Sequence, residues 1–228
     1  SRGLGDVYKR HVREQRGKQI VKELTGKDAK VVCDPTFLLT TDEWIEALME
    51  NEKERGLERN GEPYKIDTPY ILAYVLGERK DVREEIKKLR EQSGLKIVNL
   101  PHVDNYHAMD DNLGDINLYD VDPFDFIRLI RDAEYVVTDS FHGSVFSIQM
   151  HKKFLTFYRK PSSEKGNTNS RIDSLFNILG LSERLYKGDV FNQIKKNIDY
   201  GYVDRQVEEL RIDSLAFFKQ ALGLGRII

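Results

Sequence analysis

The stretch DAEYVVTDSFHGSVFSIQM, residues Asp132–Met150, decides the fold. Its apolar run Tyr135–Val137 predicts a strand, Thr138–Gly143 predicts a tight turn, and the residues from Ser144 onward predict a helix. A strand followed by a turn and a helix is the repeating unit of parallel α/β sheets. The stretch therefore predicts an α/β protein.

The same alternation of short apolar runs and amphipathic helical stretches continues through the rest of the chain. The predicted strands are Lys30–Cys33, Tyr70–Leu76, Lys96–Leu100, Tyr135–Thr138 and Phe154–Tyr158. The predicted helices are Val12–Leu24, Thr41–Arg55, Asp81–Ser93, Pro123–Ala133, Ser144–Met150, Asp173–Leu179 and Val203–Leu222. The polar segments Glu50–Asp67 and Asn105–Tyr119 are predicted to be loops. We expect an α/β fold in which parallel strands are joined by crossover helices.

Composition excludes several classes of protein. The chain has 36 Lys and Arg against 38 Asp and Glu, a net charge of −2, which argues against sequence-independent binding to nucleic acid or to an anionic membrane surface. No apolar run approaches the roughly 20 residues of a transmembrane helix. The single cysteine, Cys33, cannot form an internal disulfide, so we expect a cytoplasmic protein. Because the histidines and Cys33 show no zinc-type spacing, we expect no metal site.

The turn Thr138–Gly143 is the first candidate site. In an open parallel sheet, ligands bind beyond the carboxyl ends of the strands, where helix N-termini attract anions. Asp139 and Ser140 are N-cap residue types, Gly143 permits close backbone approach, and His142 is suited to proton transfer near neutral pH. The alternative is that the Asp-Ser pair only caps a helix and that His142 is an ordinary surface or core histidine.

A second candidate is Arg171, which lies beside the start of the predicted helix Asp173–Leu179. A cation at a helix N-terminus opposes the helix dipole, which favours a role in which an anionic ligand is shared. A surface arginine paired with Asp173 or Glu183 is the alternative. The Asp34-Pro35 pair is interpreted as a rigid crossover between structural units.

Five segments together resemble the polysaccharide pyruvyl transferase family. They are HVREQRG (His11–Gly17), CDPTFLLTTDEW (Cys33–Trp44), PYILAYVLG (Pro69–Gly77), DPFDFIRLIRDAEYVVTDSFHGSVFSI (Asp122–Ile148) and NSRIDSLFNILGLSERL (Asn169–Leu185). The resemblance implies a fold similar to the GT-B glycosyltransferases, in which two Rossmann-like halves face each other. It implies that residues 1–40 are a remnant of the first half and the crossover, residues 41–202 the C-terminal domain, and residues 203–228 a closing helix.

The resemblance also implies a reaction, the transfer of a pyruvyl group from phosphoenolpyruvate to two hydroxyls of a sugar, with no cofactor. It places His142 as the general acid or a donor-binding residue, and the backbone of Ser140, Phe141, Gly143 and Ser144 as a cradle for the donor's anionic groups. Arg171 is the expected clamp and Arg13, from the HVRE segment, a second candidate.

The turn departs from the family pattern at Ser140 and Phe141, where some members carry an arginine and a leucine. Three explanations stay open. Arg171 or Arg159 supplies the missing positive charge, or the protein holds the donor in a different way, or it catalyses a related reaction. Two other functions stay open. One is a GT-B-like glycosyltransferase that uses a nucleotide sugar, and the other is a noncatalytic glycan-binding module.

The expected partners are phosphoenolpyruvate and a sugar or polysaccharide acceptor. A lipid-linked acceptor would bring the protein to the inner face of the membrane. Phe217, Phe218 and Leu222 could pack against a second subunit, so a homo-oligomer is an open alternative. Because the family's usual first half has no counterpart before Ser1, the resemblance implies a truncated chain whose isolated activity is in doubt.

Overall fold

The computed structural model describes residues 10–56, 64–101, 106–161, 164 and 169–224. The chain divides into two compact units. Unit 1 contains the described residues up to 38, residues 170–180 and the residues from 199 onward, and unit 2 contains the described residues of 39–169 together with residues 181–198. The division at residues 40 and 202 expected for the whole protein stays a prediction.

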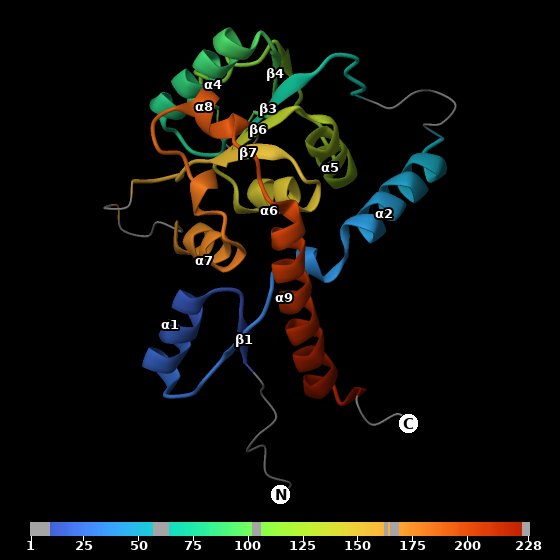
Figure 1. The fold of residues 1–228 in the computed structure, drawn as a ribbon, viewed down its shortest axis with the longest axis vertical. Coiled ribbons are helices and arrows are strands. Elements are labelled where there is room, and N and C mark those ends of the chain that lie inside the picture. Colours follow the sequence, from blue (N-terminus) through green and yellow to red (C-terminus); the bar gives the residue numbers. More distant parts are fainter. Residues whose placement is uncertain (1–9, 57–63, 102–105, 162–163, 165–168, 225–228) are drawn as a thin grey trace, which may run out of the picture. The chain divides into compact units, whose positions relative to one another are not determined.

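Unit 2 is built on a five-stranded parallel sheet with the strand order β5-β4-β3-β6-β7 (Figure 1). The strands are β3 (Tyr70–Tyr74), β4 (Lys96–Asn99), β5 (Ile116–Asn117), β6 (Tyr135–Thr138) and β7 (Lys153–Thr156). Because β6 pairs with both β3 and β7, the turns that follow these three strands lie at the same edge of the sheet.

Helices cover both faces of this sheet, as expected for a parallel sheet. One face packs against α4 (Lys80–Ser93) and α8 (Val190–Lys195). The apolar cluster on that side includes Ile71, Ala73 and Val137 from the sheet, Val82, Ile86 and Leu89 from α4, and Val190 and Ile194 from α8. The spacing of the α4 residues is that of one helix face.

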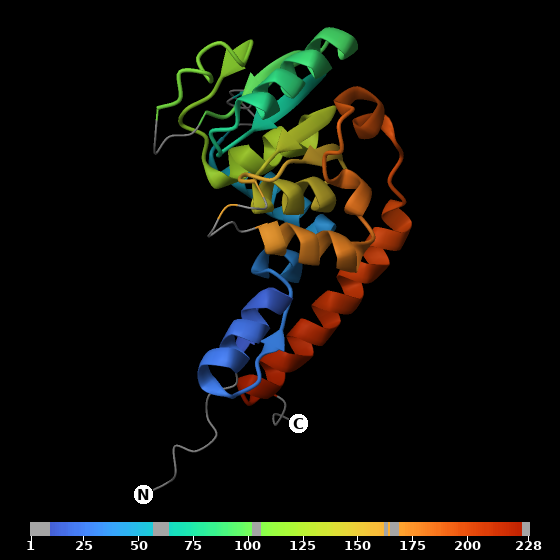
Figure 2. The ribbon, with the colours of Figure 1, turned by 90° about the vertical axis from the view of Figure 1, so that its left-hand side faces the viewer.

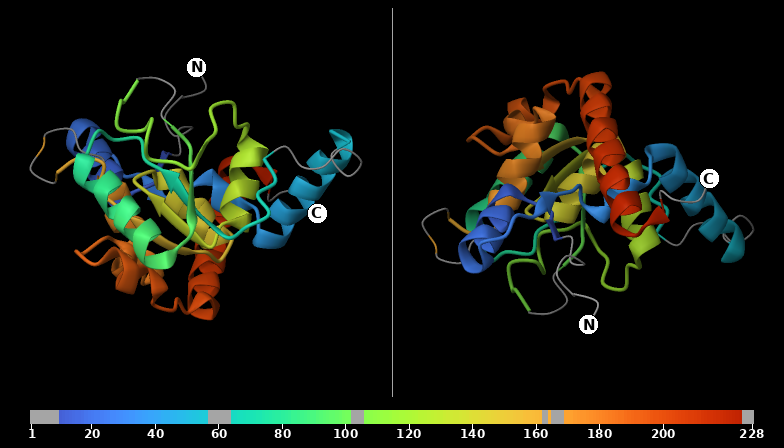
Figure 3. Two further views of the ribbon diagram at one scale, coloured as in Figure 1. Left: turned by 90° about the horizontal axis from the view of Figure 1, so that it is seen from above. Right: turned by 90° about the horizontal axis from the view of Figure 1, so that it is seen from below.

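The opposite face packs against α5 (Pro123–Asp132) and α6 (Phe141–Gln149). Figure 3 shows α4 and α5 on opposite sides of the strands. The rings of Tyr74, Phe126 and Phe146 follow one another edge to face, with centroids 4.9 and 6.1 Å apart. The helix α2 (Thr41–Glu54) extends this layer, and the ring of Trp44 lies 5.1 Å from that of Phe146. The predicted Rossmann-like α/β fold is confirmed by this three-layer arrangement.

Unit 1 contains a small β–α–β segment made of β1 (His11–Val12), α1 (Gln15–Thr25) and β2 (Lys30–Val31). A short 3₁₀ helix, η1 (Pro35–Leu38), follows. The long helix α9 (Tyr200–Ala221) runs beside this segment (Figure 2), and its Ser214 hydroxyl accepts the Cys33 N–H at 2.9 Å. The helix α7 (Asn169–Leu179) completes the unit.

The structure corrects three local predictions. Residues His11–Val12 form a strand paired with Lys30–Val31 rather than the start of a helix, and α1 begins at Gln15. The predicted loop Asn105–Tyr119 contains β5, and α8 is an additional helix of six residues. The helix expected from Ser144 begins at Phe141 because Ser140 caps it. Parts of four predicted segments, namely residues 1–9 of 1–40, 57–63 of Glu50–Asp67, 105 of Asn105–Tyr119 and 225–228 of 203–228, lie outside the described residues.

Among the residues that the structure describes, no helix combines the length and hydropathy needed to cross a membrane.

Candidate functional site

The turn between β6 and α6 places the predicted histidine on the surface. The strand ends at Thr138, and Ser140 caps the helix by accepting the Gly143 N–H at 3.3 Å. His142 lies in the first turn of α6 and is exposed, next to the half-buried ring of Phe141 at a centroid distance of 5.5 Å. An imidazole is therefore accessible to solvent at the carboxyl end of the parallel sheet, beside a helix N-terminus.

Gly143 and Ser144 are buried below this turn, and their polar groups are already bonded within the protein. The Gly143 N–H donates to the Ser140 hydroxyl and the Ser144 N–H donates to the Ser140 carbonyl at 3.0 Å. The Ser144 hydroxyl lies 2.8 Å from the hydroxyl of Thr156. These bonds stabilise the junction of β6, α6 and β7. The role of Ser140, Phe141, Gly143 and Ser144 as an anion cradle stays a prediction.

Asp139 connects this turn to the loop that follows β3. Its two carboxylate oxygens accept the N–H groups of Leu76 and Gly77 at 2.8 and 2.7 Å. Burial raises the pKa of Asp139 above its usual range, although the two N–H donors and the nearby Arg159 and Arg83 oppose that shift. Of the two cap candidates in the sequence, Ser140 is the cap, and Asp139 instead bonds across the sheet.

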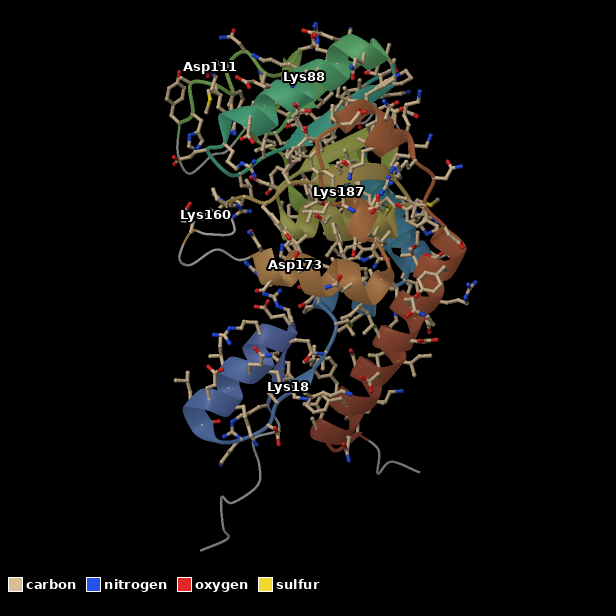
Figure 4. All side chains as sticks on the ribbon, turned by 60° about the vertical axis from the view of Figure 1, so that its left-hand side comes forward. Lys18, Lys88, Asp111, Lys160, Asp173 and Lys187 are labelled. Carbon is tan, nitrogen blue, oxygen red and sulfur yellow. The ribbon has the colours of Figure 1, made fainter. Side chains whose placement is uncertain are left out.

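A pocket of about 400 Å³ opens beside this connection. It is lined by residues after β3 and after β7: Leu76, Gly77, Glu78, Arg79, Arg159, Lys160, Pro161 and Glu164. Figure 4 shows the side chain of Lys160 on the loop that follows β7. The pocket thus lies at the edge of the sheet where ligands bind in open α/β folds, and three of its side chains are cationic.

Unit 1 brings together three of the segments that carry the family resemblance. Arg13 of the HVRE segment forms an ion pair with the buried carboxylate of Asp34, which also accepts the Thr36 N–H at 3.1 Å. Glu14, next to Arg13, accepts the hydroxyl of Ser170 at 2.9 Å. The HVRE, CDPTF and NSRI segments are therefore neighbours. Arg171 follows Ser170 in the first turn of α7 and is half-buried.

The predicted residues thus form two groups, one in each unit. Ser140, Phe141, His142, Gly143 and Ser144 lie in unit 2, and Arg13 and Arg171 lie in unit 1. Sequence analysis missed the pocket and the bridging role of Asp139. A glycine directly after a strand, Gly77, followed by Arg79, was the available signal for a ligand-binding loop.

Within the described ranges, no three histidine, cysteine or acidic side chains gather in a way that could hold a metal ion. The metal-free site stays a prediction.

In the comparison with protein families, the model described as "Polysaccharide pyruvyl transferase" matches residues 8–161, more than half of the 228-residue chain. The matched range contains Arg13 and the turn with His142 and ends at the pocket residue Pro161. No curated protein matches the chain.

Two solved structures share general similarity with the chain. UDP-GlcNAc 2-epimerase from Neisseria meningitidis, bound to UDP-GlcNAc, is 12% identical over 90% of this chain, with a TM-score of 0.47. The glycotransferase of kitacinnamycin is 12% identical over 68% of this chain, with a TM-score of 0.41. This chain spans 60% and 43% of the lengths of those two proteins.

Proposed function

The chain belongs to the polysaccharide pyruvyl transferase family, and from this premise we propose that the whole protein moves a pyruvyl group from phosphoenolpyruvate to a polysaccharide or its precursor. The observation that carries the proposal is the exposed imidazole of His142 in the first turn of α6, within the range that matches the family.

The reaction needs a proton donor and an anion site. Two acceptor hydroxyls become bonded to the central carbon of the donor, its methylene group gains a proton and becomes a methyl group, and inorganic phosphate leaves. Of the two hydroxyl protons lost, one balances the proton gained by the methyl group and the other leaves with the phosphate. The product is a cyclic ketal that carries the donor's carboxylate.

In this proposal His142 donates the proton to the methylene carbon. A general acid must reach the reacting atom, and His142 is exposed on the sheet edge where ligands bind. Cations and the positive end of a helix stabilise the phosphate and carboxylate of the donor as charge develops. Arg171 and Arg13 are proposed for the same purpose in the whole protein, as the family resemblance implies.

The proposal includes no cofactor, because protonation and phosphate departure need none. We further propose a lipid-linked polysaccharide precursor as the acceptor, which would bring the protein to the inner face of the membrane. We place the protein in the cytoplasm on this basis.

The test is an assay of the full-length protein with phosphoenolpyruvate and candidate glycans, which measures phosphate release and a mass gain of about 70 Da on the sugar, the mass of C₃H₂O₂. Replacement His142→Ala should lower the transfer rate by about 100-fold or more, because the proton donor is lost. The thermal midpoint should stay nearly unchanged, because the side chain is exposed.

The matched control is His151→Asn. His151 is an exposed histidine just beyond the other end of α6, and asparagine tolerates its positive φ of 50°. This variant should keep full transfer activity. Retained turnover in His142→Ala would remove this residue from the mechanism.

A further inference from the structure

The loop that forms one wall of the pocket in unit 2 is fixed in place by buried charged groups. The Arg83 guanidinium donates to the carbonyls of Gly77 and Arg79 at 2.7 and 3.2 Å. Arg83 is itself held by a buried ion pair with Asp110 at 2.7 Å. Asp139 accepts N–H groups of the same loop. Because both its carbonyl and its N–H groups are bonded, the loop is pre-organised before any ligand enters.

Two of the three cations in the pocket already have carboxylate partners. Arg79 forms an ion pair with Asp81 and also donates to the Tyr158 carbonyl at 2.9 Å. Lys160 forms an ion pair with Glu164 at 2.6 Å. These ion pairs hold the side chains of Arg79 and Lys160 in position and also neutralise their positive charges.

Arg159 differs from both. Its Nε atom is buried and has no hydrogen-bond partner among the described residues. The nearest carboxylate oxygen, Oδ1 of Asp139, lies 3.8 Å away, which is too long for a hydrogen bond. The side chain is 39% exposed and lines the pocket. A guanidinium has five N–H donors in a planar fork, so Arg159 can offer several of them to a ligand.

The close packing around Gly77 fixes the position of Arg159. A Cβ atom at Gly77 would lie 2.8 Å from Cγ of Arg159 and 2.8 Å from Oδ2 of Asp139. Any larger residue would therefore displace the arginine or the aspartate. The glycine allows the guanidinium to lie directly against the loop.

The start of α4 adds a further positive contribution. This 14-residue helix begins directly after the pocket loop, and its N-cap residue, Arg79, makes no side-chain capping bond. The positive end of its dipole therefore faces the loop. Glu78 is the one lining carboxylate besides Glu164, and it is exposed.

We propose that this pocket holds the phosphate group of phosphoenolpyruvate and that Arg159 is its principal ligand. The inference rests on the proposed function, because it takes the donor from that reaction. A bound phosphate would accept charge-assisted hydrogen bonds from the exposed part of the Arg159 guanidinium, whose contact to Asp139 is too long for a hydrogen bond. A volume of about 400 Å³ lies in the range of small-molecule sites and exceeds the needs of so small a donor.

The experiment is a calorimetric titration of the full chain with phosphoenolpyruvate and, separately, with inorganic phosphate at fixed ionic strength. Replacement Arg159→Gln should weaken both affinities by roughly 10-fold or more, because a charged hydrogen-bond donor is lost. Arg159→Lys should give intermediate affinity, since it keeps the charge without the planar fork. Neither replacement should lower the thermal midpoint of the ligand-free protein, because no hydrogen bond of Nε is broken.

The control is Arg131→Gln, on α5 in the same unit and outside the pocket lining. It removes the same charge and should leave both affinities unchanged. Equal binding by Arg159→Gln and the unmodified chain would overturn the inference, as would absence of phosphoenolpyruvate binding or an equal loss in Arg131→Gln. Binding of uridine diphosphate that depends on Arg159, without binding of phosphoenolpyruvate, would overturn the assignment of the donor.

The transfer assay separates this inference from the proposed function. If the full-length protein transfers pyruvyl groups and Arg159→Gln keeps its KM for phosphoenolpyruvate, the function stands and the inference fails. If phosphoenolpyruvate binds through Arg159 but no pyruvyl transfer occurs with any glycan, the binding site stands and the function fails.

Discussion

Gly143 is where α6 comes closest to β6. A Cβ atom at this position would lie 2.5 Å from Oγ1 of Thr138, and that hydroxyl is fixed because it donates to the Tyr74 carbonyl and accepts the Ser140 N–H. Sequence analysis explained the glycine by the approach of a ligand. The structure shows that close packing also requires a glycine here, which could not be predicted because the distance between helix and strand is a tertiary property.

Replacement Gly143→Ala should destabilise unit 2 by about 1–3 kcal/mol, because the added methyl group forces Thr138 or the helix to move. Urea denaturation followed by tryptophan fluorescence would measure this, since Trp44 lies in unit 2. The control is Gly17→Ala in α1, where the nearest contact of a Cβ is 3.3 Å and alanine favours the helix. An unchanged urea midpoint in Gly143→Ala would contradict the packing argument.

The hydrogen-bond partners of Asp139 could not be predicted from the residues around it in the sequence. Asp139 and Ser140 are both N-cap residue types, so the sequence alone does not assign the cap to one of them. The N–H groups that Asp139 binds lie 62 and 63 residues earlier in the chain. They become neighbours only because β3 pairs with β6. The position of the candidate turn was predictable from the sequence, but the hydrogen bonds between Asp139 and the loop that follows β3 were not.

At the level of elements, the long periodic segments were predicted well, and the elements that were missed are short. The strand Tyr135–Thr138 has the predicted bounds, and α2, α4 and α5 end within one residue of theirs. The missed strands β1 and β5 have two residues each, and α8 has six. Such elements are too short to show a period, and pairing with a neighbouring strand or packing on the sheet determines them.

Besides the buried pair of Arg83 with Asp110, a second ion pair connects α4 to the segment before β5. The Arg90 guanidinium donates to Asp115 at 2.7 Å, and Asp115 also accepts the Ile97 N–H at 2.8 Å. The hydrogen bond from Arg90 lowers the pKa of Asp115 below its ordinary value of 3.8. A carboxyl whose pKa is lower in the folded state stabilises that state above its ordinary pKa, and this stabilisation is lost as the pH falls through the folded pKa.

Replacement Arg90→Gln should therefore lower the urea midpoint slightly at pH 7, because the pair is exposed and screened. The difference from the unmodified chain should shrink as the pH falls below 3.8. Lys80→Gln, which removes a 3.6 Å pair with Glu84 on the same helix, is the control and should show a smaller difference at pH 7. A difference that grows toward low pH would refute the assigned direction.

At the scale of the whole molecule, the repeated strand–helix pattern was enough to predict the fold class. That pattern does not predict which helices and strands pack together in each of the two units. The helix α7 lies in the sequence between the two parts of unit 2, and α9 follows the second part, but both belong to unit 1 together with the first β–α–β segment. Only tertiary contacts decide this, such as the hydrogen bond from Ser170 to Glu14.

The chain carries one cysteine and one tryptophan, and they report on different units. Cys33 is buried in unit 1, where burial raises the pKa of its thiol, and Trp44 lies in unit 2. Unit 1 has a sheet of two two-residue strands, and α1 has no buried residue. We expect Cys33 to react with a thiol reagent at a lower urea concentration than that at which Trp44 fluorescence changes. Coincident transitions would show that the two units unfold as one.

The three-part composition of unit 1 has a consequence for synthesis on the ribosome. Its β–α–β segment is translated before the sheet of unit 2, whereas α9, whose Ser214 hydroxyl accepts the Cys33 N–H, is translated after that sheet. The intervening sheet can assemble while the early segment still lacks its partner helix. Until α9 has been translated, the Cys33 N–H and the Phe37 carbonyl lack their partners Ser214 and Arg211, so unit 1 can be completed only after the residues of the sheet have been made.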